Sequence, residues 1–503
     1  MTLTSLWRPD GRNALVLLAL VTLLRLAVAG LTPLSPDEAY YWVWSRALAP
    51  GYLDHPPMVA LWIRAGTALA GETALGIRLL GPLSAALGSV LMWQAARDML
   101  DDSAAALRAA VLLNATLLFG AGAVTMTPDT PLLFFWTVAL WAMARLIATD
   151  RGAWWLAAGA ACGLAMSSKY TAVLLPCGIG LWLVWARQWR WLARPVTWLS
   201  ALLGIALFAP VLWWNARHGW ASFAKQGGRG VVFHPAALLG HLGELLGGQA
   251  ALATPLIFLL CVAGVAVATR QALRTRAPGP VLLACLCLPA TAVFVEHALG
   301  DRVQANWPAI VYPAAAIAAC LAAPSLRRVL YWPAVALGVL LTALVYFQSV
   351  AAPLRLPNRL DPTLRLAGYA ALARAAQAAA AAQGASFIAM DEYGPAALLA
   401  VLGPACVPVI GLEQRWALFD LPHGAAWMAG RTGLLLRTSR RRGGPSMQDW
   451  ASLAPIGQLA RARGGQVAET YQLYKGVGRA GGEPAAVLPC PRDRSFVPPV
   501  PPG

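Results

Sequence analysis

The sequence predicts an all-α polytopic membrane protein with about eleven transmembrane helices, followed by a C-terminal α/β extracytoplasmic domain. Of the 503 residues, 58% are hydrophobic and 12% are charged, against about 25% charged residues in soluble domains. The mean hydropathy is +0.59. Long apolar runs follow one another up to residue 353, after which the composition becomes mixed. These observations assign residues 1–353 to the membrane and residues 354–503 to a separate domain.

The apolar runs have the length that a hydrocarbon layer of about 30 Å requires of a helix. Short polar turns separate most of them, as expected for consecutive spans. The predicted spans lie near 13–31, 75–96, 105–124, 130–148, 153–168, 170–186, 196–213, 249–269, 280–298, 306–323 and 329–350.

The distribution of arginine predicts the orientation in the membrane. Arginines gather in every second turn, and the short turns between them hold almost none. Because cytoplasmic loops carry the excess of basic residues, the N-terminus is predicted to be cytoplasmic, and an odd number of spans then puts residues 354–503 outside. The first span shows no cleavage site and is expected to remain as an anchor. The arginines on the inner side are Arg8, Arg12, Arg97, Arg108, Arg145, Arg151, Arg187, Arg190, Arg194, Arg270, Arg274, Arg276, Arg327 and Arg328.

Most of the varied polar chemistry lies on the outer side. Two outer loops, 32–74 and 214–248, are long, and all six histidines fall at the outer face or its margin. Loops of this length are usually functional or form helices of their own. No ionisable residue is predicted at mid-bilayer, since Arg25 lies in the outer third of the first span and can snorkel. This pattern favours a site at the outer face over a transporter, which needs polar groups at mid-bilayer.

The first outer loop opens with PLSPDEAYYWVWS, residues 33–45. Ser35 as N-cap, Pro36 at N1 and Glu38 at N3 match a capping box, which gives Glu38 a structural explanation. Asp37 is explained only weakly in this way, because any first-turn residue would serve. The aromatic helix that follows, beginning with Tyr40, is predicted at the headgroup level. Asp37 would then sit at the lip of a membrane-facing cavity, where partial desolvation suits a general base.

Three more outer segments carry candidate site residues. In GYLDHPPM, residues 51–58, two prolines hold Asp54 and His55 on a rigid turn. The segment NARHGWASFAKQGGRG, residues 215–230, is either a mobile lid over headgroups or an interfacial loop anchored by arginine and tryptophan. Lys169 is one of only three lysines. It stands at the outer end of a span, as a snorkelling anchor or as a phosphate ligand.

Cofactor motifs are sparse. No G-x-x-x-x-G-K-[ST] run and no close ligand spacing such as H-E-x-x-H occurs, so no nucleotide or metal site is predicted. A divalent cation held by outer carboxylates and histidines stays an open alternative. Six of the eight cysteines lie in spans and are typical core residues. Cys406 and Cys490 lie outside, where oxidising conditions permit a disulfide between them.

The C-terminal domain alternates predicted strands and helices. Asp361-Pro362 begins a helix by N-cap and N1 logic, and its alanine-rich run ends at Gly384. Strands are predicted over 386–390, 406–411, 433–439 and 466–474, with a helix over 394–403. The alternation indicates a small α/β domain. The proline-rich tail after Pro484 is expected to be disordered. Acceptor binding or a structural cap is the expected role of this domain.

Several motifs together resemble a known superfamily. The first outer loop with its Asp-Glu and its Asp-His-Pro-Pro is followed by GIRLLGPLSAALG (76–88), TPDTPLLFFW (127–136), GLAMSSKYTAVLLP (163–176), NWPA (306–309) and DEYGPAALLAVLG (391–403). The set resembles the polyprenyl-phosphate-sugar dependent glycosyltransferases of the GT-C fold. It is most similar to the protein O-mannosyltransferase and lipid A aminoarabinose transferase relatives, glycosyltransferase family 39 or 83. The likeness covers nearly the whole chain and is densest from 30 to 175.

The resemblance implies transfer of a sugar from an undecaprenyl phosphate carrier to lipid A or another envelope glycolipid, at the outer face of the bacterial inner membrane. A protein O-mannosyltransferase that acts on secreted Ser/Thr is the alternative within the class. A lipid or solute transporter and a lipid-binding scaffold are the alternatives outside it. The expected partners are the lipid-linked donor, a glycolipid or protein acceptor and membrane lipids, with no nucleic acid.

The site residues that the resemblance implies fall into three groups. The family's loop carboxylate matches Asp37, and the aminoarabinose branch has an acid-Lys-Pro-Pro motif where this chain has Asp54-His55-Pro-Pro. That departure leaves the phosphate contact to other cations as well. The implied catalytic residues are Asp37 and Glu38; the donor-phosphate ligands are His55, Arg78, Lys169 and Arg302; the substrate-binding residues are Asp54, Asp129, Tyr40, Arg217 and His218.

Overall fold

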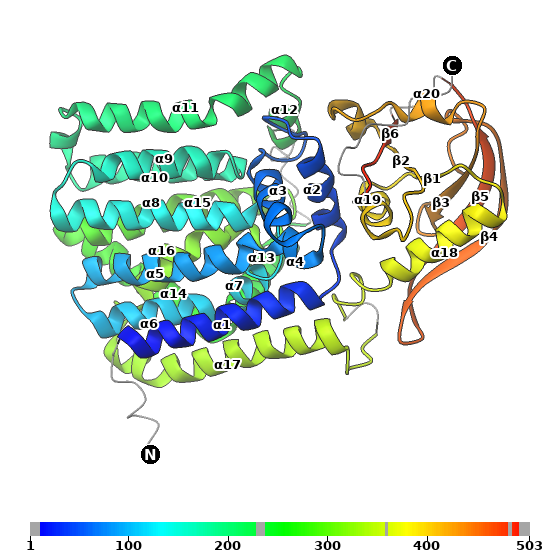
Figure 1. Ribbon diagram of the computed structural model, residues 1–503. Helices are drawn as coiled ribbons and strands as arrows, with labels where there is room; N and C mark the ends of the chain where they lie inside the picture. Colours follow the sequence, from blue (N-terminus) through cyan, green and yellow to red (C-terminus); the bar gives the residue numbers. More distant parts are fainter. Residues whose placement is uncertain (1–10, 228–236, 358–360, 481–484, 492–503) are drawn as a thin grey trace. The chain divides into compact units, whose positions relative to one another are not determined.

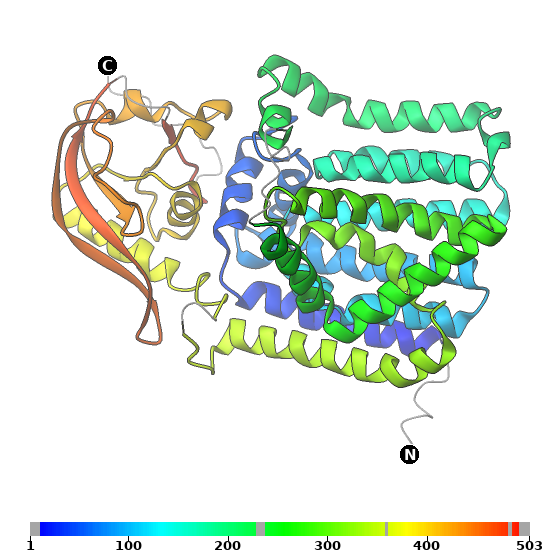
Figure 2. The same ribbon diagram turned by 180° about the vertical axis from the view of Figure 1, so that it is seen from behind.

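The computed structural model describes residues 11–227, 237–357, 361–480 and 485–491, and these residues form two compact units. We call them the helical unit and the sheet unit (Figures 1 and 2). The helical unit holds the described residues of Met1–Ala29, Asp54–Trp62 and Arg78–Phe347, and the sheet unit those of Gly30–Leu53, Ile63–Ile77 and Gln348–Gly503. The sheet unit therefore includes two parts of the first long loop as well as the C-terminal residues.

Long apolar helices build the helical unit, and small buried residues such as Ala106, Ala139, Ala284 and Ala316 fill much of its core. Its longer helices are α1 (Gly11–Leu31), α5 (Leu80–Leu100), α8 (Asp129–Thr149), α11 (Pro195–Arg217), α14 (Pro255–Thr275), α15 (Pro278–Ala298) and α17 (Pro324–Ala351). Shorter ones are α6 (Ser103–Ala115), α7 (Leu117–Gly122), α9 (Trp154–Met166), α10 (Leu174–Trp185), α12 (Ala221–Gly227), α13 (Leu238–Ala253) and α16 (Tyr312–Ala319). The short helix α4 (Ala74–Arg78) lies mostly in the sheet unit.

Within the described residues, seven helical stretches are long and apolar enough to cross a membrane. Each predicted span overlaps at least one helix, but the count of eleven crossings is not confirmed, because several of the helices are shorter. The predicted span 249–269 begins and ends too early, because the corresponding apolar helix is α14, Pro255–Thr275. In the structure α13 ends at Ala253, Thr254 has a φ of 68°, and α14 begins with Pro255 at its first turn. A proline suits the start of a helix but not its interior, so the break falls at this point.

Glycines allow the helices to approach closely. A Cβ on Gly159 of α9 would clash with the carbonyl oxygen of Ser200 on α11, and one on Gly338 of α17 would clash with that of Ala115 on α6. Backbone contact of this kind is the usual means of packing helices in a membrane, where apolar side chains gain little by leaving lipid.

Arg25 of α1 does not snorkel, and the expectation that it does is wrong. Its side chain is 3% exposed, and it donates a hydrogen bond of 3.0 Å to Oδ1 of Asn114 on α6. Arg25 lines an apolar groove of about 500 Å³ between α1, α5, α6 and α17. The guanidinium turns inward because the bundle supplies an amide partner there.

The sheet unit contains a six-stranded sheet in the order β4-β5-β3-β1-β2-β6. β1 pairs in parallel with β2 and with β3, and the other neighbours are antiparallel. This confirms the α/β class of the C-terminal domain. The strands are β1 (Phe387–Met390), β2 (Val409–Leu412), β3 (Thr432–Thr438), β4 (Trp450–Arg463), β5 (Gln466–Gly478) and β6 (Ala485–Val487); its helices include α2 (Pro36–Arg46), α18 (Tyr369–Ala382), α19 (Tyr393–Leu402) and α20 (Gly424–Met428). Helix α3 (Met58–Ala70) spans both units.

Three sequence predictions for this unit need correction. The helix predicted from Asp361 begins at Tyr369, because Gly368 has a φ of 84° and Asp361 instead accepts the amides of a single turn. The long strand β4 was not predicted, since most of its residues are exposed and it lacks an apolar face. The tail after Pro484 is ordered at its start, where β6 pairs with β2. Residues 492–503 lie outside the described part.

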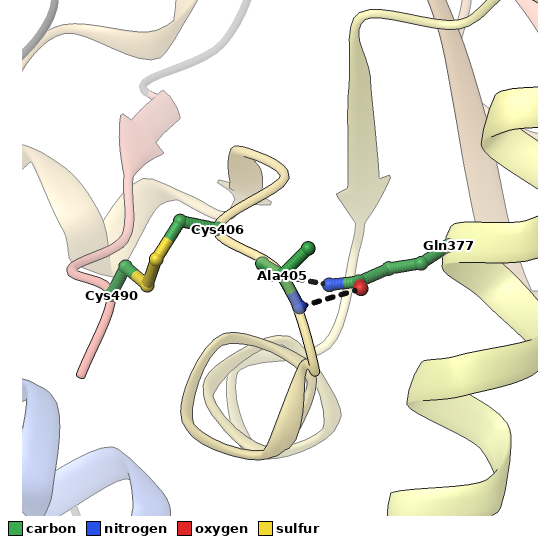
Figure 3. Close-up of a disulfide and its surroundings, with 4 residues drawn as sticks. All are labelled: Gln377, Ala405, Cys406 and Cys490. Carbon is green, nitrogen blue, oxygen red and sulfur yellow. Dashed lines mark hydrogen bonds between the residues drawn. A yellow bond between two sulfur atoms is a disulfide. The ribbon is translucent and has the colours of Figure 1, made fainter. Parts of the chain in front are cut away.

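A disulfide joins Cys406 and Cys490, with 5.7 Å between their Cα atoms (Figure 3). Cys406 precedes β2, and Cys490 follows β6, so the bond reinforces the pairing of these two strands. Gln377 of α18 supports the same loop by accepting from the backbone amide of Ala405 and donating to its carbonyl oxygen, at 3.1 and 2.7 Å. The bond thus closes one edge of the sheet.

Replacement of Cys490 should destabilise the sheet unit. We expect Cys490→Ser to lower the free energy of unfolding by about 2–5 kcal/mol, because the cross-link closes a long loop. Urea unfolding of the protein in detergent micelles, followed by tryptophan fluorescence, measures this change. Cys177→Ser is the matched control, since Cys177 is a free, exposed cysteine of α10. Equal stability of the two variants would contradict the prediction.

Candidate active site

Helix α2 carries the acid pair and begins as predicted. Ser35 is its N-cap, its hydroxyl accepts from the backbone N–H of Glu38, and Oε2 of Glu38 accepts from the backbone N–H of Ser35 at 2.9 Å. The capping box is therefore confirmed. The Glu38 side chain is fully buried, whereas Asp37 is exposed. The cap leaves Asp37 as the acid of the pair that faces outward from the helix start.

The chain after residue 390 surrounds the first turns of α2. The hydroxyl of Tyr393 donates to Oδ1 of Asp37 at 3.0 Å. Tyr40 is 2% exposed, and its ring lies 4.6 Å from that of Tyr393 and 5.6 Å from that of Trp416. Tyr40 is thus a packed residue of the sheet unit, and its role as a substrate contact stays a prediction.

The C-terminal end of α2 is held by Glu72. Its carboxylate accepts from Arg46 at 2.5 Å and from the indole N–H of Trp42 at 2.6 Å. Arg46 also donates to Thr67 of α3 at 2.7 Å. Both ends of α2 are therefore fixed within the sheet unit, which leaves Asp37 little freedom beyond its own side-chain rotation.

In the helical unit, Asp54 lies against α12. Its carboxylate forms an ion pair with Lys225, and its backbone carbonyl accepts from Gln226 at 2.9 Å. The amide of Met58, just after the two prolines, donates to the carbonyl of Ser167 at 3.0 Å. The Asp-His-Pro-Pro turn therefore contacts both α12 and the Ser-Ser-Lys turn that ends α9.

Lys169 belongs to a buried polar cluster. Its ammonium donates to Oδ1 of Asp129 at 2.7 Å, and Asn306 donates to Oδ2 of the same carboxylate at 2.7 Å. The side chains of Lys169 and Asp129 are 9% and 13% exposed. The snorkelling alternative for Lys169 is excluded, because its ammonium points to a carboxylate inside the bundle.

The other predicted residues have different surroundings. Arg78 is 1% exposed and donates to the carbonyl oxygen of Ala29 at 2.8 Å. Arg302 forms an exposed ion pair with Glu244 at 2.7 Å. His55 is half-buried on its turn; Arg217 lies over the ring of Trp213 at 4.5 Å; the ring of His218 stacks on Trp214 at 4.1 Å.

The predicted residues thus fall into two sets. Asp37, Glu38 and Tyr40 belong to the sheet unit. Asp54, His55, Arg78, Asp129, Lys169, Arg217, His218 and Arg302 belong to the helical unit. Within the second set, backbone and side-chain contacts bring the Asp54 turn, the Lys169 turn and α12 together. The roles of all these residues in binding and catalysis stay predictions.

The structure adds four residues to the predicted site. Lys225 and Asn306 complete the carboxylate contacts of Asp54 and Asp129, and Tyr393 and Arg415 border α2. Three of them lie in segments that the sequence already marks, the loop 215–230, NWPA and DEYGPAALLAVLG. Their side-chain partners were not predictable, because each pair joins segments far apart in the chain.

Metal ligands do not converge in this part of the molecule. Among the described residues, no three histidine, cysteine, aspartate or glutamate side chains are grouped as a metal site would require. In the polar clusters described above, the carboxylates of Asp54 and Asp129 pair with lysines, and Asp129 also accepts from the amide of Asn306.

Comparison with known proteins supports the sequence resemblance. Residues 54–214 match the model of the family described as "Dolichyl-phosphate-mannose-protein mannosyltransferase". The chain is 28% identical over 297 residues to lipid A galacturonosyltransferase RgtD of Rhizobium johnstonii, covering 56% of this chain and 59% of that enzyme. It is 30% identical over 180 residues to the undecaprenyl phosphate-alpha-4-amino-4-deoxy-L-arabinose arabinosyl transferase of Pseudomonas aeruginosa, covering 31% and 32%. The chain therefore matches less than two thirds of the length of these relatives.

The fold likeness extends further. The crystal structure of ArnT from Cupriavidus metallidurans in the apo state matches with a TM-score of 0.61 at 17% identity, covering 92% of this chain and 98% of ArnT. The two chains therefore share one fold. ArnT bound to undecaprenyl phosphate matches this chain with a TM-score of 0.58 at 16% identity, covering 91% and 97%. The predicted GT-C fold, with helices followed by a C-terminal sheet domain, is thus confirmed.

The buried pair in this GT-C bundle should be sensitive to removal of one partner. We expect Lys169→Met to lower the free energy of unfolding by about 3–5 kcal/mol, because Asp129 would be left as an uncompensated buried charge. The double variant Asp129→Asn with Lys169→Met should recover part of the loss. Denaturant unfolding in detergent micelles measures both.

The control for this prediction is Arg190→Met. Arg190 and Asp150 form an ion pair whose side chains are 60% and 58% exposed, and such pairs contribute about 0–1 kcal/mol. A Lys169→Met variant as stable as Arg190→Met would show that the buried pair carries no special cost of separation.

Proposed function

We propose that this protein transfers a sugar from a polyprenyl phosphate, undecaprenyl phosphate in the first instance, to lipid A or another envelope glycolipid. The observation that carries the proposal is the likeness to ArnT over 92% of the chain, including the structure of ArnT bound to undecaprenyl phosphate. The names of two sequence relatives support the same donor and acceptor. One is named as a lipid A transferase, and the other is named for a sugar carried on undecaprenyl phosphate.

The proposed location is the bacterial inner membrane, with a cytoplasmic N-terminus and a periplasmic sheet domain. The arginine-rich turns support this orientation through the positive-inside rule. The Cys406–Cys490 disulfide supports it independently, because disulfides persist in the periplasm and are rare in the cytoplasm. The site would then open to the face where a flipped lipid-linked donor and the acceptor meet.

The proposed reaction is a single displacement at the anomeric carbon. The acceptor hydroxyl oxygen attacks that carbon, the bond from carbon to the phosphate oxygen breaks, and polyprenyl phosphate leaves with the electron pair. Asp37 takes the proton of the hydroxyl as general base, a role that contributes about 10²–10⁴-fold. Its exposure at the start of α2 supports this assignment over Glu38, whose buried carboxylate serves the helix cap.

The donor phosphate needs cations that stabilise the charge developing on it as it leaves. Lys169 is the proposed principal ligand, because it is held in place by Asp129 and its ammonium has three donor hydrogens. One carboxylate contact therefore leaves capacity for a phosphate oxygen. Lys225 stands in the same relation to Asp54. His55, Arg78 and Arg302 remain proposed ligands, of which Arg302 on its exposed ion pair is the most accessible.

The second candidate function is protein O-mannosylation. The match of residues 54–214 to the dolichyl-phosphate-mannose-protein mannosyltransferase family favours it. The two functions share the lipid-phosphate donor and the base, and they differ in the acceptor. A glycolipid is the first choice because the relative that matches over 297 residues is named for lipid A.

Donor consumption tests the proposal directly. Purified protein in liposomes with crude outer-envelope lipid is given a panel of polyprenyl-phosphate sugars, and release of free polyprenyl phosphate is measured. We expect one donor to turn over with the wild type, and Asp37→Asn to lose about 10²–10⁴-fold of the rate. Glu38→Gln should lose far less, because glutamine at N3 can still complete the capping box.

Asp150→Asn is the matched control for the loss of a carboxylate. Asp150 is exposed at the C-cap of α8 with a φ of 54°, a backbone conformation that asparagine also tolerates. If Asp37→Asn is as active as this control, the base must be sought at Asp54 or Asp129. If the wild type consumes no donor but moves lipid across the bilayer, the transporter alternative is favoured. Addition of a Ser/Thr-containing acceptor peptide separates the glycolipid from the protein acceptor.

A further inference from the structure

The N-termini of α2 and α19 meet within the sheet unit. A Cβ built on Gly394 would lie 2.5 Å from the Cβ of Pro36, so only glycine permits this approach. The two helices pack against each other and are neighbours in Figure 1. The close approach brings the residue before Gly394 to the residue after Pro36, which are Tyr393 and Asp37.

Tyr393 is rigidly placed at this contact. Its hydroxyl donates to Oδ1 of Asp37 at 3.0 Å. The guanidinium of Arg415 lies over its ring at 3.9 Å from the centroid, and the ring of Tyr40 packs beside it at 4.6 Å. A guanidinium over an aromatic face is attracted by the ring quadrupole. The phenol is thus clamped from two sides while its hydroxyl points at the carboxylate.

A charge network fixes the segment that precedes Tyr393. Asp391 follows β1 and accepts from Arg437 of β3 at 3.1 Å and from Arg441 at 3.2 Å. Glu413 follows β2 and accepts from Arg415 at 2.6 Å. Burial raises the pKa of Glu413, with Arg415 acting in the opposite direction. Arg441 also lies 3.8 Å from Glu413, so the segments that follow β1, β2 and β3 are joined by one charge network.

We infer that Tyr393 is a positioning residue for the reaction, which orients the carboxylate of Asp37 toward the acceptor hydroxyl; the inference rests on the proposed function. An exposed aspartate in the first turn of a helix can rotate about its side-chain bonds. A hydrogen bond to one oxygen fixes the plane of the carboxylate and so the direction of the second oxygen. Proton abstraction depends on such alignment, and small misplacements of a reacting group are costly. The sheet domain would thereby contribute to catalysis rather than serve only as a cap.

The test compares Tyr393→Phe with the wild type in the donor assay. The phenylalanine keeps the ring between Arg415 and Tyr40 and removes only the hydroxyl. We expect kcat to fall about tenfold or more, with KM for the lipid donor within about twofold of wild type. In the Asp37→Asn background the same change should produce no further loss, since the two groups act together. Tyr474→Phe on β5 is the control, because Tyr474 packs on the sheet core away from α2.

A second measurement is independent of turnover. Hydrogen exchange of the α2 amides, in full-length protein, should be faster in Tyr393→Phe than in Tyr474→Phe, because one bond that holds the helix start is missing. If the wild type consumes no donor, the proposed function fails, and unchanged exchange would then overturn the inference as well.

The outcomes separate cleanly. An inactive Asp37→Asn together with a fully active Tyr393→Phe overturns the positioning role and leaves the proposed function standing. Equal losses in kcat, donor affinity and thermal stability in Tyr393→Phe would show that Tyr393 is a structural residue. That result would also overturn the positioning role. An active Asp37→Asn removes the base and the inference together.

Discussion

Charge held away from water is the constraint on which the helical unit depends. A bundle in hydrocarbon offers a buried ion no solvent, so each polar group needs a partner inside the protein. Asp129 receives Lys169 and Asn306, and Asp98 receives Arg145 at 3.0 Å. These partners stand 40, 177 and 47 positions from their carboxylates. Each pair therefore fixes two distant segments, in a bundle whose apolar contacts alone would tolerate sliding.

In the sheet unit, contacts between distant segments likewise fix the position of an element, here helix α2. In open α/β sheets, ligands bind outside the carboxyl ends of the strands. Here the residues after the carboxyl ends of β1 and β2, Tyr393 and Arg415, contact α2 instead. The edge that would ordinarily receive a ligand holds the helix that carries Asp37. This arrangement explains why residues 30–53 belong to the same compact unit as the C-terminal residues, a grouping that a boundary at 353 does not anticipate.

The sequence allowed prediction wherever a local rule decides the structure. The Ser35–Glu38 capping box, the apolar helices and the strands that become β1, β2, β3 and β5 follow from spacing and composition over a few residues. The failures share one cause, which is that a distant partner decides. Arg25 turns inward because Asn114 is there, and β4 exists because β5 offers an edge for pairing. Thr254 ends α13, and Gly368 puts the start of α18 after the predicted one, through backbone angles that apolar periodicity does not reveal.

Two of the cations in the candidate site are lysines, and lysine differs from arginine in how it binds a carboxylate or a phosphate. The chain has 39 basic residues, of which only three are lysines, and two of these, Lys169 and Lys225, pair with carboxylates of the predicted motifs. Arginine in these positions would bind a carboxylate through a planar, rigid fork that uses two of its five donors. A lysine ammonium is a compact charge with three donors, so it can hold a carboxylate and still turn toward a phosphate. In a chain so rich in arginine, lysine at these two positions supports the phosphate-binding role that we propose for them.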